Sequence, residues 1–270
     1  MFEIIKRFFG VKEEKQPLQK KQNTKSDKIA IRKGELGEYK IDIQLAQLPK
    51  DHLSLSDLMI SNSHSRTGYS QIDHVIITPY GVLVIETKNY QGTIYGGKDR
   101  KTWLINGKFK MMNPLTQNYG HIQALKKLVK PEYRNMFYSF VTFTKRCTLK
   151  VDLEIRDIKS DEVVLYDLQL TEYINRKVSV LKLIHKQPLI SHEEMKNIYE
   201  TLLDVNIIDP IIREKHVAIL KEQSSASKDI NENKCSVCGI SVSEKVKRYC
   251  NSDKRFEGKI FCYKHQKNVG

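Results

Sequence analysis

The sequence predicts an α/β fold of the mixed α+β kind, with a small metal-binding module at its C-terminal end. Two runs of β-branched residues flank the turn Thr78-Pro79-Tyr80-Gly81, a pattern that indicates a β-hairpin. Apolar residues recur at helical spacing before and after this hairpin. Most of the cysteines lie after residue 234, which indicates a separate small unit. We therefore expect a central mixed sheet flanked by helices, followed by that unit.

Each further element has its own signal. In the first helix, the predicted core stripe is Leu36, Tyr39, Ile43 and Leu48. A later helix begins after Ser191, whose side chain suits an N-cap, and the glutamate at 194 completes a capping box. The expected elements are, in order, a helix within 28–48, a hairpin and a further strand at 71–96, a stretch at 106–129 that turns from a short strand into a helix, strands at 137–144 and 163–170, and a helix at 191–205.

Length and charge restrict the class of protein. A chain of 270 residues is long enough for one sizeable core and a minor domain. Its 46 Lys and Arg against 32 Asp and Glu give a net charge of +14, which favours polyanionic partners such as nucleic acid or an anionic membrane surface. No apolar run approaches the roughly 20 residues of a spanning helix, and no signal peptide is evident. We expect a cytoplasmic protein without transmembrane segments.

Shifts in composition predict four regions. Residues 1–30 have few apolar side chains after the first turn and read as a flexible basic segment. Residues 31–220 hold the periodic segments and form the main domain. Residues 221–233 are rich in Ser and Asn, as expected of a linker, and residues 234–270 form the metal-binding module.

The hairpin carries the residues that suggest chemistry. Asp73 begins one strand, and Glu86 and Lys88 end the other on a shared face, because strand side chains alternate. A two-residue loop would pair Asp73 with Glu86 directly, whereas a three-residue loop with a bulge at Gly81 would shift the register by one. Adjacent carboxylates can hold Mg²⁺ for phosphodiester hydrolysis, and a lysine can polarise water or phosphate. A surface ion pair is the alternative reading.

Three blocks of sequence resemble a known family. GELGEYK at 34–40, QIDHVIITPYGVLVIETKNYQGTIYG at 71–96 and NPLTQNYGHIQALKKL at 113–128 resemble the nuclease-related domain, NERD, a branch of the PD-(D/E)XK nuclease superfamily. The resemblance implies a restriction-endonuclease-like core. It also implies that Asp73, Glu86 and Lys88 are the D, E and K of the superfamily pattern. Ile72 stands where the superfamily has proline, although QIDH is the form found in the NERD branch.

The resemblance also implies a supporting acid in the first helix. Glu35 and Glu38 lie at i and i+3 and can share a face, so either could ligate the metal, with Glu38 preferred. Gln117 and His121, at i and i+4, are candidates for positioning phosphate or water, and ordinary helix-surface polarity is the alternative.

Together these residues predict a metal-dependent nuclease that hydrolyses DNA phosphodiester bonds with Mg²⁺ or Mn²⁺, in DNA processing, repair or defence. RNA is an alternative substrate. The competing hypotheses are a non-catalytic nucleic-acid-binding protein, which would use the same basic surfaces, and a zinc-mediated protein-interaction adaptor.

The C-terminal segment predicts a zinc site. Cys235 and Cys238 form a CxxC pair, and Cys262 and His265 form a second pair at matching spacing, which is typical of a tetrahedral Zn²⁺ site. Cys250 is the alternative fourth ligand, although the paired spacing favours a packing role for it. Basic and aromatic residues interleave here, suited either to phosphate and base contact or to a small core. The segment resembles the zinc-finger appendages that accompany NERD domains.

Overall fold

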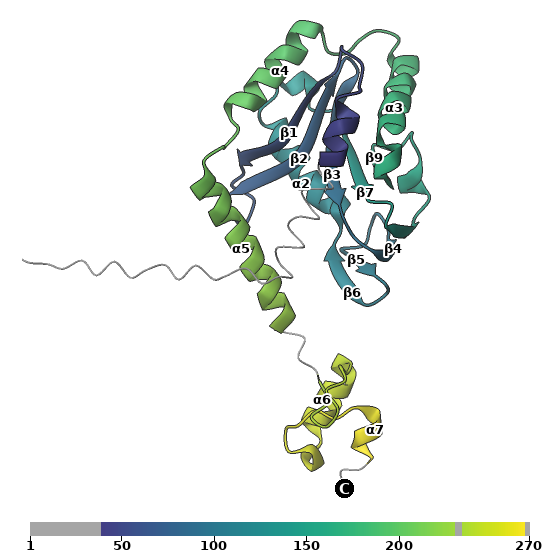
Figure 1. Ribbon diagram of the computed structural model, residues 1–270, viewed down its shortest axis with the longest axis vertical. Helices are drawn as coiled ribbons and strands as arrows, with labels where there is room; N and C mark the ends of the chain where they lie inside the picture. The colour runs from purple at the N-terminus through teal and green to yellow at the C-terminus, as the bar shows by residue number, and fades with distance from the viewer. Residues whose placement is uncertain (1–38, 230–233, 268–270) are drawn as a thin grey trace, which may run out of the picture.

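The computed structural model describes residues 39–229 and 234–267 (Figure 1). Its centre is a mixed five-stranded sheet of order β1-β2-β3-β7-β9, in which β1, β2 and β3 are antiparallel neighbours while β7 and β9 run parallel to β3. The five strands are β1 (Leu53–Ser61), β2 (Tyr69–Thr78), β3 (Gly81–Lys88), β7 (Phe137–Phe143) and β9 (Glu162–Tyr166).

Helices cover both faces of this sheet, which explains why β7 is buried along its whole length. Apolar residues of α2 (Pro114–Lys126) and α4 (His192–Asp204) pack on one face. The helix at 39–45 and α3 (Leu170–His185) pack on the other. Figure 1 shows α3 and α4 on opposite sides of the sheet. The mixed α+β architecture predicted from the sequence is confirmed.

A second, four-stranded sheet of order β6-β5-β4-β8 follows the end of β3. Trp103 anchors it: the indole is fully buried, lies parallel to the ring of Phe143 at 6.1 Å, and donates its N–H to the carbonyl of Gly97. The strands are β4 (Gly92–Gly96), β5 (Thr102–Ile105), β6 (Phe109–Met112) and β8 (Cys147–Val151). This sheet connects β3 to α2, so it joins the two elements that carry the candidate site.

The remaining elements are short or lie toward the C-terminus. Helix α5 precedes the metal-binding module, which contains α6, η5 and α7 around a core of Cys235, Cys250, Phe256 and Phe261. No helix among the described residues has the length and apolar character needed to cross a bilayer. The bounds are η2 (Pro131–Tyr133), η3 (Glu154–Arg156), η4 (Asp167–Gln169), α5 (Pro210–Asp229), α6 (Glu244–Ser252), η5 (Lys254–Phe256) and α7 (Tyr263–Gln266).

Three local expectations differ from the structure. In the first helix Ile41 and Leu45 are buried while Tyr39 and Ile43 are exposed, so the prediction of the core-facing residues was wrong at these positions. Ile41 and Leu45 pack in the same cluster as Leu170, Ile174 and Leu181 of α3. Ser191 caps α4 as expected, but the Glu194 carboxylate binds Lys130 instead of closing a capping box.

The third difference lies before the module. The segment 221–233, expected as an irregular linker, is helical as far as residue 229, because α5 continues through it. Lys, Glu, Gln and Ala in this stretch are good helix formers, which a linker assignment from Ser and Asn content overlooks. The domain boundaries themselves stay predictions, and the segment 1–30 lies outside the described residues.

Candidate functional site

The β2–β3 hairpin places two carboxylates next to each other. Thr78 pairs with Gly81 across a two-residue loop, and the pairing continues to His74 opposite Ile85. Asp73 and Glu86 are the next positions in this register, which the sequence left open between two alternatives. The Asp73 carboxylate accepts a hydrogen bond of 2.6 Å from the backbone N–H of Thr87, so Asp73 is tied to the strand that carries Glu86.

Gly81 fixes this register by its size. A Cβ there would lie 2.6 Å from the ring of Tyr138 and 2.7 Å from the carbonyl oxygen of Met136, and the residue has a φ of +151°. Only glycine fits such a close approach of neighbouring chain. The hairpin is therefore held against β7 at its turn, and its open end carries Asp73 and Glu86.

Glu86, Lys88 and Gln117 form a closed polar triangle. The Lys88 ammonium donates to Glu86 Oε1 at 2.5 Å and to Gln117 Oε1 at 2.9 Å, and Gln117 Nε2 donates to Glu86 Oε1 at 2.7 Å. Glu86 is only 3% exposed, although it lies at the end of an apolar strand. A buried carboxylate needs this many partners, since charge without them is costly to remove from water.

The second carboxylate oxygen of Glu86 has a different environment. It lies 3.4 Å from His121 Nε2 of α2, yet neither this oxygen nor either ring nitrogen of His121 has a hydrogen-bond partner among the described residues. Buried polar atoms are normally paired, so unpaired ones that face each other indicate a place for a bound ion or water. Both helix residues suggested by the sequence, Gln117 and His121, therefore reach Glu86.

The charged forms of Glu86 and Lys88 stabilise each other. Burial raises the pKa of the Glu86 carboxyl, but the Lys88 ammonium and His121 outweigh it, so that pKa is lowered below its ordinary value. Burial likewise lowers the pKa of Lys88, but the attraction of Glu86 and, further away, of Asp73 raises it overall. Glu86 is thus an anion and Lys88 a cation at neutral pH, the states that metal binding and phosphate contact require.

Two asparagines that the sequence reasoning missed orient α2 over the site. Asn113 caps the helix by accepting from the N–H of Leu115, and its amide donates to backbone carbonyls before β5. Asn118 is fully buried, and its amide donates to the carbonyl of Val84 and to the hydroxyl of Ser139. The Asn118 side chain therefore bridges β3 and β7. A signal did exist: Asn118 interrupts the apolar face that Ile122 and Leu125 continue.

Glu35 and Glu38, the predicted supporting acids, lie outside the described residues. In the part that it describes, Asp73 and Glu86 do not join His121 in a group of ligand atoms within 4.8 Å of one another; the Cys/His cluster of the C-terminal module does. A supporting acid from the first helix therefore stays a prediction.

Comparisons with known proteins match the part of the chain that carries this site. A family model described as nuclease-related domain, NERD, matches residues 33–144, the stretch that contains Asp73, Glu86, Lys88 and Gln117. An uncharacterised protein of Bacillus anthracis is 32% identical over 192 residues, which cover 70% of this chain and 84% of the relative. The chain belongs to the NERD family. No solved structure matches it.

The polar triangle of this NERD domain thus lies in a nuclease-like fold. The glutamate, lysine and glutamine of the triangle come from β3 and α2, and the neighbouring Asp73 comes from β2, all within the matched residues. Membership shows a nuclease-like superfamily, and it suggests nucleic acid as the partner class.

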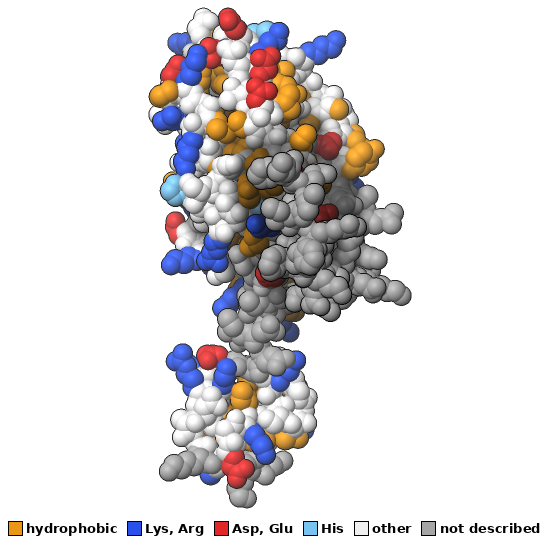
Figure 2. Space-filling model, turned by 90° about the vertical axis from the view of Figure 1, so that its left-hand side faces the viewer, with side chains coloured by type: hydrophobic (Ala, Val, Ile, Leu, Met, Phe, Trp, Pro, Cys, Tyr) orange, Lys and Arg blue, Asp and Glu red, His pale blue; other side chains and the backbone are white. Residues whose placement is uncertain are grey.

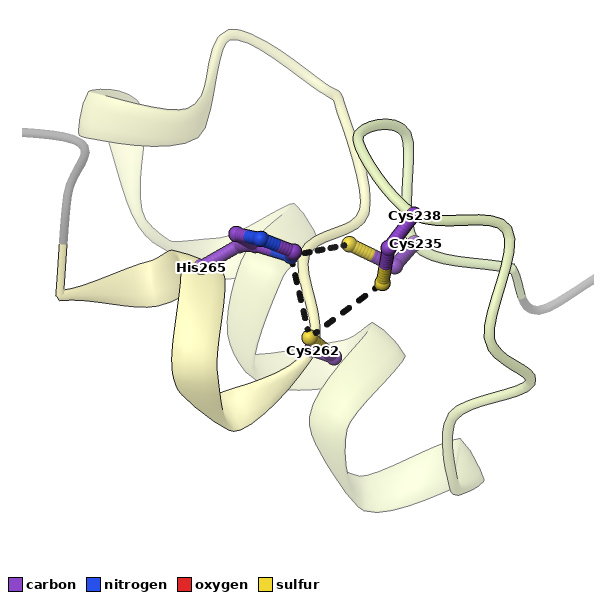
Figure 3. A group of neighbouring side chains, drawn as sticks. All are labelled: Cys235, Cys238, Cys262 and His265. Carbon is purple, nitrogen blue, oxygen red and sulfur yellow. Dashed lines mark hydrogen bonds between the residues drawn. The ribbon is translucent and has the colours of Figure 1, made fainter.

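The C-terminal module of the NERD protein gathers four metal-ligand side chains. Cys235, Cys238, Cys262 and His265 have ligand atoms within 4.8 Å of one another. Figure 3 shows His265 Nδ1 facing the sulfurs of Cys235 and Cys262, at 3.4 and 3.3 Å, and the sulfur of Cys238 at 3.7 Å from that of Cys262. A tetrahedral zinc site has sulfur–sulfur separations of about 3.8 Å and sulfur–nitrogen separations of about 3.6 Å, from the usual bond lengths. The donor set therefore fits zinc.

The surroundings of Cys235 favour a thiolate, whereas neighbouring Cys235 and Cys262 raise the pKa of the Cys238 thiol. Burial raises the pKa of the Cys235 thiol, but backbone N–H groups of the loop and the His265 ring outweigh it and lower that pKa to about 5. Cys250 is outside the cluster: it is fully buried, and its sulfur accepts from the N–H of Phe261 at 3.4 Å. Of the aromatics, Phe256 and Phe261 form the core of the module, whereas Tyr249 is 47% exposed.

Several basic side chains lie on the outside of this module. Figure 2 shows blue Lys and Arg side chains scattered over the visible face of the C-terminal unit, together with a few acidic and hydrophobic ones. Among the described residues of the module, the exposed cations are Lys234, Lys245, Arg248, Arg255, Lys259, Lys264 and Lys267. Such a surface suits phosphate contact.

Proposed function

We propose that this protein is a divalent-metal-dependent nuclease that hydrolyses phosphodiester bonds of DNA. The observation that carries the proposal is the carboxyl group of Glu86: one oxygen is fully engaged by Lys88 and Gln117, while the other is buried, has no hydrogen bond among the described residues and lies 3.4 Å from His121 Nε2. A structural ion pair has no need for this arrangement, because leaving a buried charged oxygen without a hydrogen bond costs free energy. A cation ligand needs such an oxygen.

The donor set fits Mg²⁺ or Mn²⁺. Carboxylate oxygens of Asp73 and Glu86 are hard ligands of the kind these ions prefer, with Glu38 or Glu35 as the predicted supporting acid. When bound, the ion supplies an activated water and neutralises charge that develops on the phosphate. The imidazole of His121, next to Glu86, adds a nitrogen donor that Mn²⁺ accepts more readily than Mg²⁺ does.

The remaining groups act on the phosphate. Lys88 has one hydrogen bond to Glu86 and one to Gln117, which fix its ammonium group 2.5 Å from the carboxylate. A cation held in this way contributes to the transition state without reorganising, and such preorganised charge is the larger part of phosphodiester catalysis. Gln117 holds the carboxylate and the ammonium in one geometry through both ends of its amide.

We further propose that the module binds one Zn²⁺ through Cys235, Cys238, Cys262 and His265 and adds sequence-independent affinity for DNA. Few apolar residues form its core, so a metal supplies much of its folding free energy. Its exposed cations contact phosphate, which positions substrate without reading sequence.

The test is cleavage of labelled DNA by the full chain. Single-stranded and double-stranded DNA, and an RNA of the same sequence, are incubated with Mg²⁺, with Mn²⁺ and with excess EDTA. The proposal predicts cleavage of DNA with either ion and none with EDTA. Retention of DNA on the protein without cleavage under every metal condition would favour the non-catalytic binding protein. Absence of both binding and cleavage would favour the zinc-mediated adaptor.

A further inference from the structure

The β5–β6 hairpin leaves large apolar side chains in solvent. Phe109 is 66% exposed and Met112 is 55% exposed. Trp103 of β5 and Met111 of β6, which pair with each other, are buried. Ile105 pairs with Phe109 at the last step of the ladder, and Asn106 and Gly107 turn the chain with positive φ angles of 53° and 68°. The exposed phenyl ring thus stands beside the tip of the hairpin. Figure 1 shows β5 and β6 at the lower end of the main domain.

The charge of this hairpin is entirely positive. Residues 101–112 contain Lys101, Lys108 and Lys110 and no Asp or Glu. All three lysines are exposed, and none forms an ion pair with a described residue. Neighbouring Lys98, by contrast, lies within 3.6 Å of two glutamates. An exposed aromatic ring between unpaired cations is the combination that binds a nucleic-acid strand, because the ring stacks on a base and the cations contact phosphate.

The hairpin is fixed relative to the candidate nuclease centre. The amide of Asn113 donates to the carbonyls of Lys98 and Arg100 at 3.1 and 2.9 Å, while its side-chain oxygen caps α2, the helix of Gln117. The chain runs directly from Met112 into this helix. Gln117 follows Met112 by five positions along the chain, so their Cα atoms are at most about 18 Å apart. The hairpin is therefore within a few nucleotides of the polar triangle.

We propose that the β5–β6 hairpin binds an unpaired nucleic-acid strand next to the nuclease centre, with Phe109 stacked on a base and Lys108 and Lys110 on the flanking phosphates. Bases inside a duplex are stacked on each other and offer no free face to the ring, so the site selects single-stranded segments. The choice of nucleic acid as partner rests on the proposed function, and the hairpin adds the strand preference.

The experiment measures affinity without catalysis. Full-length wild-type protein and Phe109→Ala are titrated, in EDTA, against a fluorescent single strand and against the matching blunt duplex. Loss of one stacked base predicts about tenfold weaker binding of the single strand and unchanged binding of the duplex. A strand with 2-aminopurine should change fluorescence on binding wild type but not Phe109→Ala. Lys108→Ala with Lys110→Ala should reduce the salt dependence, by about 1.4 in the slope of log affinity against log salt.

The matched control is on α3, where Leu183 is 79% exposed beside the exposed Lys182 and Lys186. Leu183→Ala should leave both affinities unchanged. Equal affinity of wild type and Phe109→Ala for the single strand would overturn the inference, and it would leave the nuclease proposal standing because no divalent cation is present. A dimer of wild type that Phe109→Ala dissociates in sedimentation velocity would also overturn it, since the hairpin would then contact a second copy.

Discussion

At the scale of single residues, the charge of Glu86 is the feature that needs explanation. A carboxylate with 3% exposure is stable only because an ammonium group and an amide surround one of its oxygens. Replacing such a pair by apolar residues often leaves a protein as stable or more stable, so burial of the pair is weak evidence for a stabilising role. The position of the pair at the open end of a hairpin, beside Asp73, favours a chemical role for it.

Gln117 provides a residue-scale prediction. Gln117→Leu removes two hydrogen bonds to charged groups, each worth about 1.5–3 kcal/mol of stability, so the free energy of unfolding should fall. In the fraction of the variant that stays folded, the cleavage rate should fall tenfold or more, because Glu86 and Lys88 are no longer held in one geometry. Single-turnover cleavage with Mg²⁺ and chemical denaturation measure the two quantities. Gln123→Leu is the control, because position 123 points about 240° around the same helix. A normal rate in Gln117→Leu would show that the triangle does not serve catalysis.

Individual residues also show what the sequence could and could not provide. The identities of Asp73, Glu86 and Lys88 followed from strand alternation and from family resemblance, but the register between Asp73 and Glu86 depends on loop length, which Gly81 decides through contact with β7. Asn118 was missed, because its partners, Val84 and Ser139, belong to distant strands.

At the scale of elements, the sequence predicted helices and strands correctly where a hydrophobic pattern extends over many residues. It failed where contacts with a neighbouring element determine which face of a helix is buried. The hairpin, β7 and α2 follow from β-branched runs and a helical period. The core face of the helix at 39–45 did not, because α3, which contributes the opposing surface, was not predicted from the sequence. Helix α5 was not predicted, and its last residues were assigned to a linker because their Ser and Asn content was weighed above the helix formers among them.

The metal-binding module gives the element-scale prediction. With zinc bound, iodoacetamide at pH 8 should modify none of the five cysteines quickly; after chelation, Cys235, Cys238, Cys250 and Cys262 should react as the module unfolds. Cys147 should stay protected in both states, because it is 4% exposed and burial raises the pKa of its thiol to about 11. Mass spectrometry of tryptic peptides reads out each site.

Two cysteine variants distinguish a metal ligand of the module from a cysteine of its core. Cys250→Ser should retain one zinc per chain, since its sulfur contacts Phe261 and not the cluster, whereas Cys262→Ser should release the metal. Protein without zinc, or zinc lost from Cys250→Ser but kept in His265→Ala, would contradict the ligand set and favour four cysteines.

At the scale of the whole molecule, the described parts are a three-layer domain with a nuclease-like centre and a small Cys/His module. Each has its own core, and neither core includes a residue of the other. The family accounts for residues 33–144, and the similarity to the relative extends over 192 residues. The net charge of +14 suits a partner that is a polyanion.

The central claim is that Glu86 serves catalysis and not merely the fold. The measurement is the single-turnover rate of DNA cleavage with Mg²⁺ by wild type and by Glu86→Gln, together with DNA affinity in EDTA. The substitution keeps the shape of the side chain but removes the charge that holds the ion, whose contribution amounts to several kcal/mol. We predict a rate at least a hundredfold lower, with DNA affinity unchanged. Cleavage by Glu86→Gln at the wild-type rate would contradict the account.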